Sequence, residues 1–241
     1  MRAREVPKKS ATLENIVNKL NCKNFGQCYG VIPESFAGNK WITMGKTLII
    51  GYDVCHPEPQ SKYERRLKIP PSQPSVLGIS FNGAVCAETF IGDYAYQEPR
   101  QERVTGSILE ERIGWILNLF WLNRNTLPET VIITRDGVSE GQFRMVMEGE
   151  IEAFRVGMRR YAKTTKGIEN YSPRIVCIIA CKRHNKRFAL DNGRMLENCL
   201  PLTVIDKDIT RPDTTEFFMQ SHKIIKVVLQ RMQNEVFDAS Q

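Results

Sequence analysis

The sequence predicts an α/β domain built around a mixed β-sheet. Short apolar runs typical of buried strands alternate with amphipathic helical patterns along the 241 residues. An Asn82-Gly83 pair between two strand-like runs adds a hairpin, and therefore an antiparallel pair of strands. The expected order of elements is helix, strand, hairpin, helix, strand, helix, strand.

The N-terminal part is expected to contribute one helix and one strand. Apolar residues at i, i+3, i+4 and i+7 predict a helix from Ser10, a capping residue, to about Asn21. The apolar run Thr47–Tyr52 predicts a buried strand. Residues 56–74 hold five of the twelve prolines together with several charges, so we expect a surface loop there.

The hairpin is expected next. Asn-Gly is a strong turn signal because both turn positions favour positive φ. The flanking runs Val76–Phe81 and Ala84–Phe90 therefore read as its two strands, and residues 91–103 read as a loop.

The remaining elements continue the alternation of helices and strands. Apolar spacing predicts long helices at about 105–123 and Glu140–Lys163. Apolar runs predict strands at Thr130–Thr134 and Arg174–Cys181, and a short strand at Leu202–Ile205.

Composition and charge narrow the function classes. Lys and Arg total 34 against 27 Asp and Glu, a net charge of +7, which mildly favours a polyanionic partner. No run approaches the roughly 18 apolar residues that a membrane span needs, so we expect no membrane partner. Seven scattered cysteines in a chain of this size are expected to be reduced thiols, which places the protein in the cytoplasm or the nucleus.

Two predicted strands each run into an aspartate, Asp53 and Asp136. In α/β sheets, ligands bind at the carboxyl ends of strands. Carboxylates there can share hard divalent cations, and a pair of such ions can promote phosphodiester cleavage. The alternative is that each Asp only caps a turn or a helix.

Several segments together resemble the Piwi domain of Argonaute proteins over about residues 10–222. The most specific is Arg-Asp-Gly-Val-Ser-Glu-Gly-Gln at 135–142. The others follow in the family's order: Asp-Val-Cys-His-Pro at 53–57, Pro-Arg-Gln-Glu at 99–102, Lys-Arg-His-Asn-Lys-Arg-Phe at 182–188, Ile-Thr-Arg-Pro at 209–212 and Gln-Ser-His at 220–222.

The resemblance implies an RNase H-like fold, with a central mixed sheet and helices on both faces. It also implies a catalytic site in which Asp53, a mobile Glu102 and Asp136 are three of four residues that hold two Mg²⁺ (or Mn²⁺) ions. Such ions would orient a water toward the scissile phosphate of a target RNA paired to a small guide RNA.

The fourth ligand of the family has no match in this sequence. In the family it follows the Ser-His segment by several dozen residues, whereas the resemblance here stops at His222. We therefore expect a protein that binds guide and target RNA in RNA-mediated silencing but cuts poorly or not at all. The alternative is an active metal-dependent RNA endonuclease.

A basic run is the candidate phosphate-binding surface. Ten Lys or Arg and one acid lie between Arg155 and Arg187, a pattern that suits RNA phosphates or, alternatively, a solvated basic face. Lys182 and Arg187 match guide-phosphate positions of the family, and Arg183 lies beside them. Arg211 is added on charge and order alone.

The N-terminal helix resembles the end of the family's Mid domain, where two lysines four residues apart bind the 5′-phosphate of the guide. Lys19 and Lys23 have this spacing and share a helix face; two solvated lysines are the alternative. We accordingly divide the chain into a Mid-like end and linker (1–45), a C-terminally truncated Piwi domain (46–222) and a divergent tail (223–241). Silencing-complex proteins are further candidate partners.

Overall fold

The structure is a computed structural model that describes residues 10–24, 26, 45–182, 184–191, 193 and 196–220. By its contacts the chain divides into two compact units, Met1–Lys182 and Arg183–Gln241. Arg183, His222 and the predicted tail at 223–241 lie outside the described residues.

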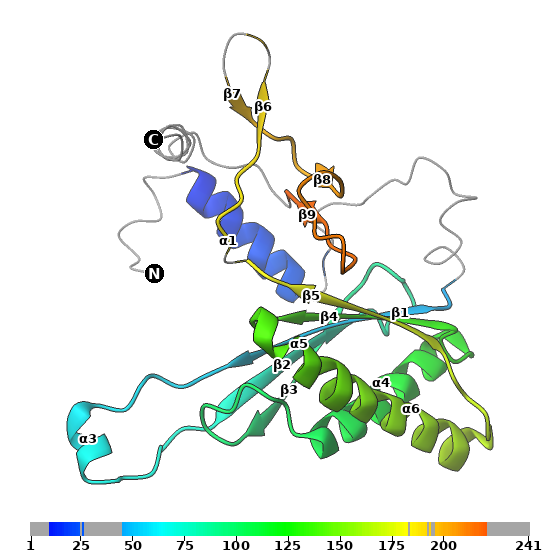
Figure 1. Cartoon of the computed structure of the whole chain (residues 1–241). Coiled ribbons are helices and arrows are strands. Elements are labelled where there is room, and N and C mark those ends of the chain that lie inside the picture. The colour runs from blue at the N-terminus through cyan, green and yellow to red at the C-terminus, as the bar shows by residue number, and fades with distance from the viewer. Residues whose placement is uncertain are drawn as a thin grey trace. The chain divides into compact units, whose positions relative to one another are not determined.

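The first unit is organised around a five-stranded sheet (Figure 1). Its order is β3-β2-β1-β4-β5; β1 pairs in parallel with β4 and β4 with β5, whereas β1/β2 and β2/β3 are antiparallel. This mixed sheet confirms the predicted fold class. The strands are β1 (Thr47–Cys55), β2 (Ser75–Phe81), β3 (Ile91–Gln97), β4 (Thr130–Asp136) and β5 (Arg174–Ala180).

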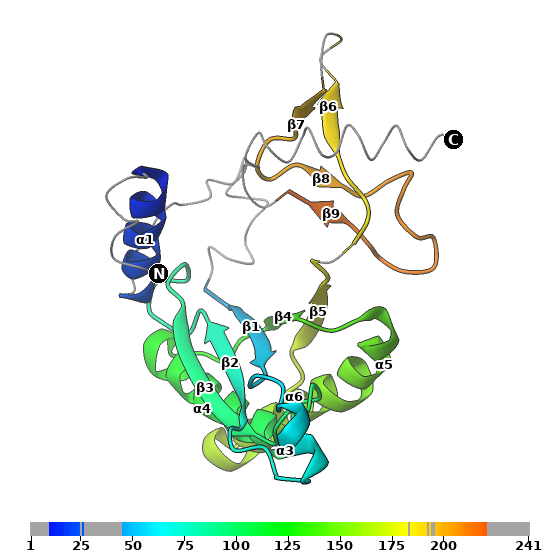
Figure 2. The same ribbon diagram turned by 90° about the vertical axis from the view of Figure 1, so that its left-hand side faces the viewer.

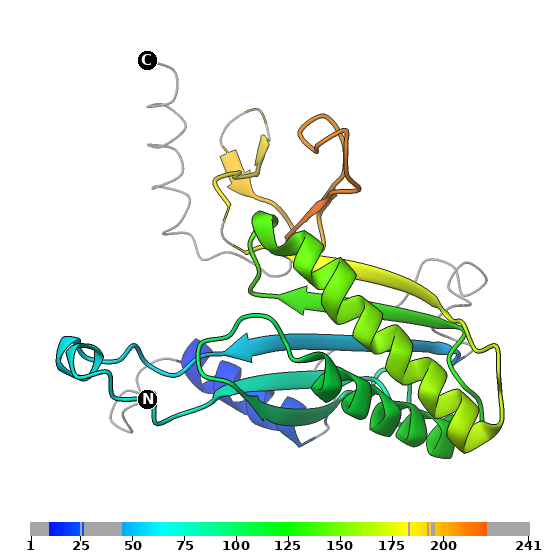
Figure 3. The ribbon, with the colours of Figure 1, turned by 60° about the horizontal axis from the view of Figure 1, so that its bottom comes forward.

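One face of the sheet forms the core. Alternate residues of β1, such as Leu48, Ile50 and Tyr52, are buried, as the two-residue period of a strand requires. Two long helices, α4 (Gly106–Arg124) and α6 (Ile151–Lys166), pack against each other across one face (Figure 3).

Gly157 permits the close contact between these two helices. A Cβ at this position would lie 2.4 Å from the Ile113 side chain and 2.8 Å from the backbone of Glu110. A larger residue would therefore push α6 away from α4.

The predicted hairpin is wrong in its second strand. In β3, Ile91 pairs with Phe81, so residues 82–90 connect the two strands and residues 91–97 of the predicted loop form a strand. The reason is Asn82, which is almost fully buried and accepts a hydrogen bond from Ile49 N through its Oδ1 (2.7 Å). Its Nδ2 donates to Thr47 O and Ala87 O, so the residue joins β1 to the connection instead of forming a two-residue turn.

The predicted helix at 140–163 is present but composite. It begins with η2 (Glu140–Gln142) and α5 (Phe143–Met145), passes through the π-helical turn η3 (Val146–Glu150), and continues as α6. Such turns carry one extra residue and are frequent at functional sites.

Two further helices lie outside the core. α1 (Ser10–Lys23) matches the predicted N-terminal helix, but its apolar residues Leu13, Val17 and Leu20 remain about half exposed. The short α3 (Lys62–Arg66) forms inside the predicted loop 56–74, where Ser61 and Glu64 make a capping box. It projects beyond the ends of β1 and β2 (Figure 1).

The second unit contains two short antiparallel ladders (Figure 2). The strands are β6 (Ala189–Asp191) with β7 (Leu196–Asn198), and β8 (Val204–Ile205) with β9 (Phe218–Met219). The strand predicted at Leu202–Ile205 is present only as β8, since Leu202 has a positive φ of 68°. Among the described helices, none has the length and apolarity to cross a membrane.

Candidate active site

Asp53 and Asp136 lie on adjacent strands, β1 and β4. The register of the parallel pair places Tyr52 opposite Arg135, the residues that directly precede the two aspartates. Both aspartates therefore lie at the carboxyl end of the sheet, where α/β folds commonly bind ligands.

Gly137 brings the acidic side chains around one backbone position. Its φ is +85°, and a Cβ on this residue would lie 2.7 Å from Asp53 Oδ1 and 3.7 Å from Glu102 Oε1. Its backbone N–H donates to Asp136 Oδ1 (2.9 Å). The structure thus brings together all three acids that the sequence proposed as catalytic.

Glu102 reaches the site from the loop after β3. Its Oε1 accepts a hydrogen bond from Arg135 Nη2 (3.0 Å), and its Oε2 lies 2.8 Å from His56 Nε2. Arg135 Nη2 also donates to the carbonyl oxygen of Glu102 (2.9 Å). The loop backbone and the carboxylate are therefore held by the same guanidinium.

His56 and Ser75 connect this loop to the two central antiparallel strands. An ionised carboxylate only accepts, so His56 Nε2 donates to Glu102, and His56 Nδ1 lies 2.9 Å from the Ser75 hydroxyl oxygen, within hydrogen-bond distance. Ser75 Oγ accepts in turn from the backbone N–H of Arg100 (2.7 Å). Each bond constrains the loop that carries Glu102.

Arg135 is the centre of the network and is fully buried. Its Nε donates to Glu150 Oε2 (3.1 Å), and its Nη1 lies 3.8 Å from Asp53 Oδ1. Burial acts to lower the pKa of Arg135, but hydrogen bonding to Glu150 and the nearby negative charges outweigh it, so the pKa is raised. Burial, followed by the charge of Glu150, also raises the pKa of Tyr52 well above its usual range. Because its pKa is raised, Arg135 stays positively charged.

The three carboxylates offer the oxygen donors that a hard divalent cation binds. Carboxylate oxygens are the ligands that Mg²⁺ and Mn²⁺ prefer, and the carboxylates of Asp53 and Glu102 both approach the position that a Cβ of Gly137 would take. In the described part of the chain, however, no three His, Cys, Asp or Glu side chains already form a group that could hold an ion. Asp53, Glu102 and Asp136 are the residues that would hold one.

Lys182, predicted to bind guide phosphate, donates a hydrogen bond to Asp136 Oδ2. It lies just beyond the end of β5, and its side chain is 75% exposed. The hydrogen bond to Asp136, then the charges of Asp136 and Asp53, raise the pKa of Lys182. The ammonium group of Lys182 therefore binds the carboxylate of Asp136, which a metal ion would also need as a ligand.

The other predicted phosphate-binding residues belong to α1 and to the second unit. Lys19 and Lys23 are exposed on α1. In the second unit, Lys186 donates to Ile209 O (2.6 Å) and Arg187 Nη1 donates to two carbonyl oxygens of its own loop. Arg211 forms an ion pair with Glu216 (3.7 Å).

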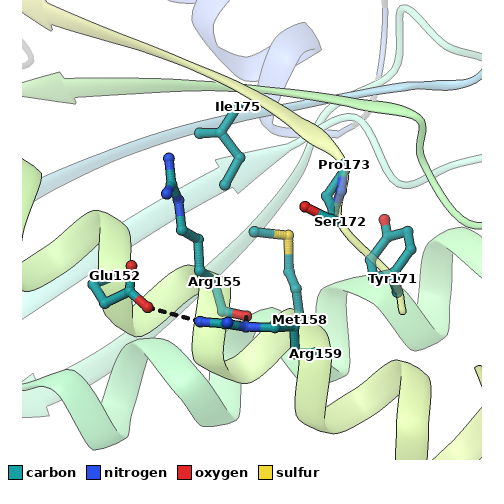
Figure 4. A pocket seen from close by; sticks show the side chains of 8 residues that line it. All are labelled: Glu152, Arg155, Met158, Arg159, Tyr171, Ser172, Pro173 and Ile175. Atoms are coloured by element: carbon teal, nitrogen blue, oxygen red, sulfur yellow. Dashed lines mark hydrogen bonds and ion pairs between the residues drawn. The ribbon is translucent and has the colours of Figure 1, made fainter. Parts of the chain in front are cut away.

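The basic run is divided by the fold. Its first cations lie on α6, where Arg159 bonds to Glu152 (2.7 Å). Arg155 and Arg159 line a cavity of about 250 Å³ beside the start of β5 (Figure 4). Lys182 lies past the other end of that strand. Arg155, Arg159 and Lys182 therefore cannot form one continuous phosphate track.

Sequence patterns do not indicate the buried network beside the acids. In the sequence, Tyr52 belongs to a strand pattern, Arg135 to a motif and Glu150 to a helix pattern, and nothing marks Ser75 as part of a site. One signal was available for Glu150, since it lies four residues from Val146 and from Phe154 on the apolar face of a predicted helix.

Comparison with known proteins assigns the family. The family description that matches the chain is "Piwi domain", and the match extends over residues 1–236. The chain belongs to the Piwi domain family of Argonaute proteins. The Piwi assignment agrees with the resemblance of the segments around Asp53 and Asp136.

Individual relatives agree with this Piwi domain assignment. The chain is 31% identical over 223 residues to Argonaute protein wago-1 of Caenorhabditis elegans, covering 90% of this chain and 22% of that protein. The C-terminal lobe of a budding yeast Argonaute is 26% identical, with a TM-score of 0.67 over 88% of this chain and 42% of that one. Kluyveromyces polysporus Argonaute, solved with a guide RNA, has a TM-score of 0.64 at 24% identity over 88% of this chain and 24% of that one.

This Piwi domain spans only part of its relatives. It covers between 16% and 22% of the length of three curated proteins that it matches.

Proposed function

We propose that this Piwi domain binds a small guide RNA and a complementary target RNA as part of RNA-mediated gene silencing. The observation that supports this most directly is the convergence of Asp53, Glu102 and Asp136 at the carboxyl end of the sheet. Three carboxylates that suit divalent ions are the arrangement expected at a phosphodiester. The net charge of +7 favours a polyanion.

Metal-dependent cleavage of guide-paired RNA is the second candidate function. It is favoured by Glu102, which Arg135 and His56 hold beside the two aspartates. Bound divalent ions would supply charge to activate water and stabilise the leaving oxygen. We rank cleavage below binding because the described residues contain no ready group of three metal ligands.

The domain boundaries and partners belong to the same proposal. Residues 1–45 would contribute a Mid-like segment with Lys19 and Lys23 at the guide's 5′-phosphate, 46–222 the Piwi domain, and 223–241 a divergent tail. Silencing-complex proteins would be partners in the cytoplasm or the nucleus. None of the six described cysteines is part of a disulfide, which agrees with a reducing compartment.

Salt-dependent RNA binding tests the proposal. Fluorescence anisotropy of a labelled 5′-phosphorylated single-stranded RNA would give the affinity at several salt concentrations. Changing Lys182, Arg183 and Arg187 to Gln should weaken binding to all sequences alike. A plot of the logarithm of the binding constant against the logarithm of the salt concentration has a negative slope. This slope should become shallower by about 2, since each lost phosphate contact removes about 0.7.

A matched triple variant on α6 serves as the control. Arg155, Arg159 and Lys163 carry the same charge and lie on a surface helix away from Lys182. Their change to Gln should leave RNA affinity as in the parent. Equal losses in both triple variants, or no RNA binding by the parent, would contradict the proposed function.

A further inference from the structure

Glu150 lies in the helix layer beneath the candidate active site, and the proposed function gives it no role. Its side chain is fully buried in the π-helical turn η3. Burying a carboxylate costs several kcal/mol unless its oxygens are well paired, so its bonds decide what it does.

Both oxygens of Glu150 are used. Oε2 accepts hydrogen bonds from the Tyr52 hydroxyl (2.6 Å) and from Arg135 Nε (3.1 Å). Oε1 accepts from the backbone N–H of Val104 (2.9 Å). The carboxylate thus joins two strands and a loop to one helix.

Each of these three partners lies within two residues of one of the three acids. The pairs are Tyr52 with Asp53, Arg135 with Asp136, and Val104 with Glu102. Along a strand, neighbouring side chains point to opposite faces, so a bond below the sheet fixes the direction of the next residue above it.

We propose that Glu150 is a positioning residue that sets the mutual placement of Asp53, Glu102 and Asp136 through these three bonds. The expected effect of Glu150 on metal binding rests on the proposed metal-dependent chemistry. Its effect on the placement of the three acids does not depend on that chemistry.

Changing Glu150 to Gln should disturb this placement while keeping the shape of the side chain. The Gln carbonyl can still accept from Val104, but its amide N–H₂ then meets the N–H of Arg135, two donors facing each other. Arg135 would keep Glu102 and Asp53 as its negative neighbours and draw them toward itself. Both carboxylates would be less available to a metal ion.

Two measurements on the full chain test this inference. Equilibrium Mn²⁺ binding, followed by electron paramagnetic resonance, should show an affinity about 10- to 100-fold lower in Glu150→Gln, the range typical for residues that orient metal ligands. Amide hydrogen exchange should become faster in residues 98–105, the loop that carries Glu102. Tyr52→Phe, which removes one bond and keeps the charge, should give a smaller change in both.

A core variant separates positioning from general stability. Leu117 is fully buried on α4 and has no bond to this network, so Leu117→Ala should lower thermal stability without changing Mn²⁺ affinity or loop exchange. If Glu150→Gln matches Leu117→Ala in both measurements at equal fraction folded, the inference is wrong. If the parent binds no Mn²⁺, the proposed cleavage chemistry fails, and loop exchange alone decides the positioning role.

Discussion

Lys182 is hydrogen-bonded to Asp136, so a side chain expected on an RNA phosphate lies on a carboxylate expected to bind metal. Lys182 cannot bond to Asp136 and to an RNA phosphate at the same time, so the two expectations are compatible once the lysine leaves the carboxylate. A lysine that moves to an RNA phosphate frees Asp136, and a divalent ion that binds Asp136 displaces the lysine. RNA binding and metal binding would then favour each other.

Removing the Lys182 charge should therefore raise Mn²⁺ affinity in the absence of RNA. An exposed ion pair is worth about 0–1 kcal/mol, so we expect Lys182→Gln to bind Mn²⁺ up to about fivefold more tightly than the parent. In the parent, but not in the variant, added RNA should raise Mn²⁺ affinity further.

Lys186 provides the control for this prediction. It lies four residues away and bonds to Ile209 O and Glu216, not to the three acids. Lys186→Gln should leave Mn²⁺ affinity unchanged without RNA. An unchanged affinity in Lys182→Gln would show that its bond to Asp136 does not compete with metal.

Gly137→Ala should weaken metal binding. The added Cβ would lie 2.7 Å from Asp53 Oδ1, so that carboxylate must move. The positive φ of 85° adds a backbone cost of about 1–2 kcal/mol. Equilibrium Mn²⁺ binding and chemical denaturation would measure the two effects.

Gly167→Ala is the matched comparison. Gly167 ends α6 with a φ of +68°, and a Cβ there would meet nothing within 4 Å. Both variants should lose similar stability, but only Gly137→Ala should lose Mn²⁺ affinity. Equal Mn²⁺ affinities would mean that Asp53 takes no part in the site.

The free energy of unfolding should fall as pH rises above about 10. Burial and Glu150 keep the Tyr52 phenol protonated in the folded state, and burial does the same for Tyr171. In the unfolded chain both phenols ionise near pH 10. The unfolded state then holds fewer protons, so each phenol lowers stability by about 1.4 kcal/mol per pH unit.

Tyr52→Phe isolates the contribution of Tyr52. Denaturant melts of the parent and the variant between pH 8 and pH 11 should show a shallower alkaline loss in the variant, by up to about 1.4 kcal/mol per pH unit. Below about pH 9 the two slopes should coincide. Parallel curves throughout would mean that Tyr52 ionises freely when folded.

Local patterns predicted the elements whose formation depends on nearby residues. Apolar runs predicted β1, β4 and β5, and apolar spacing predicted α4, in which Ile113 and Leu117 are fully buried. The same patterns could not predict the hairpin, because Asn82 bonds to Ile49, 33 residues earlier in the chain.

The candidate site also contains some residues that local patterns predict and others that they do not. Asp53 and Asp136 could be predicted because each follows its own apolar run. The role of Glu150 could not be, because its bonds to Tyr52 and Val104 join residues 98 and 46 positions away. Nothing in a helical pattern indicates such partners.

Cleavage of a perfectly paired target by this chain should be slow or undetectable. The described residues hold no group of three ready metal ligands, and Lys182 and Arg135 hold the carboxylates of Asp136 and Glu102. Losing electrostatic support for the reacting oxygens commonly costs about 3–4 kcal/mol of barrier, and each 1.4 kcal/mol is about tenfold in rate. Single-turnover cleavage in Mn²⁺, with Asp136→Ala as control, measures the rate. Rapid cutting that Asp136→Ala abolishes would show that a further ligand, outside the described residues, completes the site.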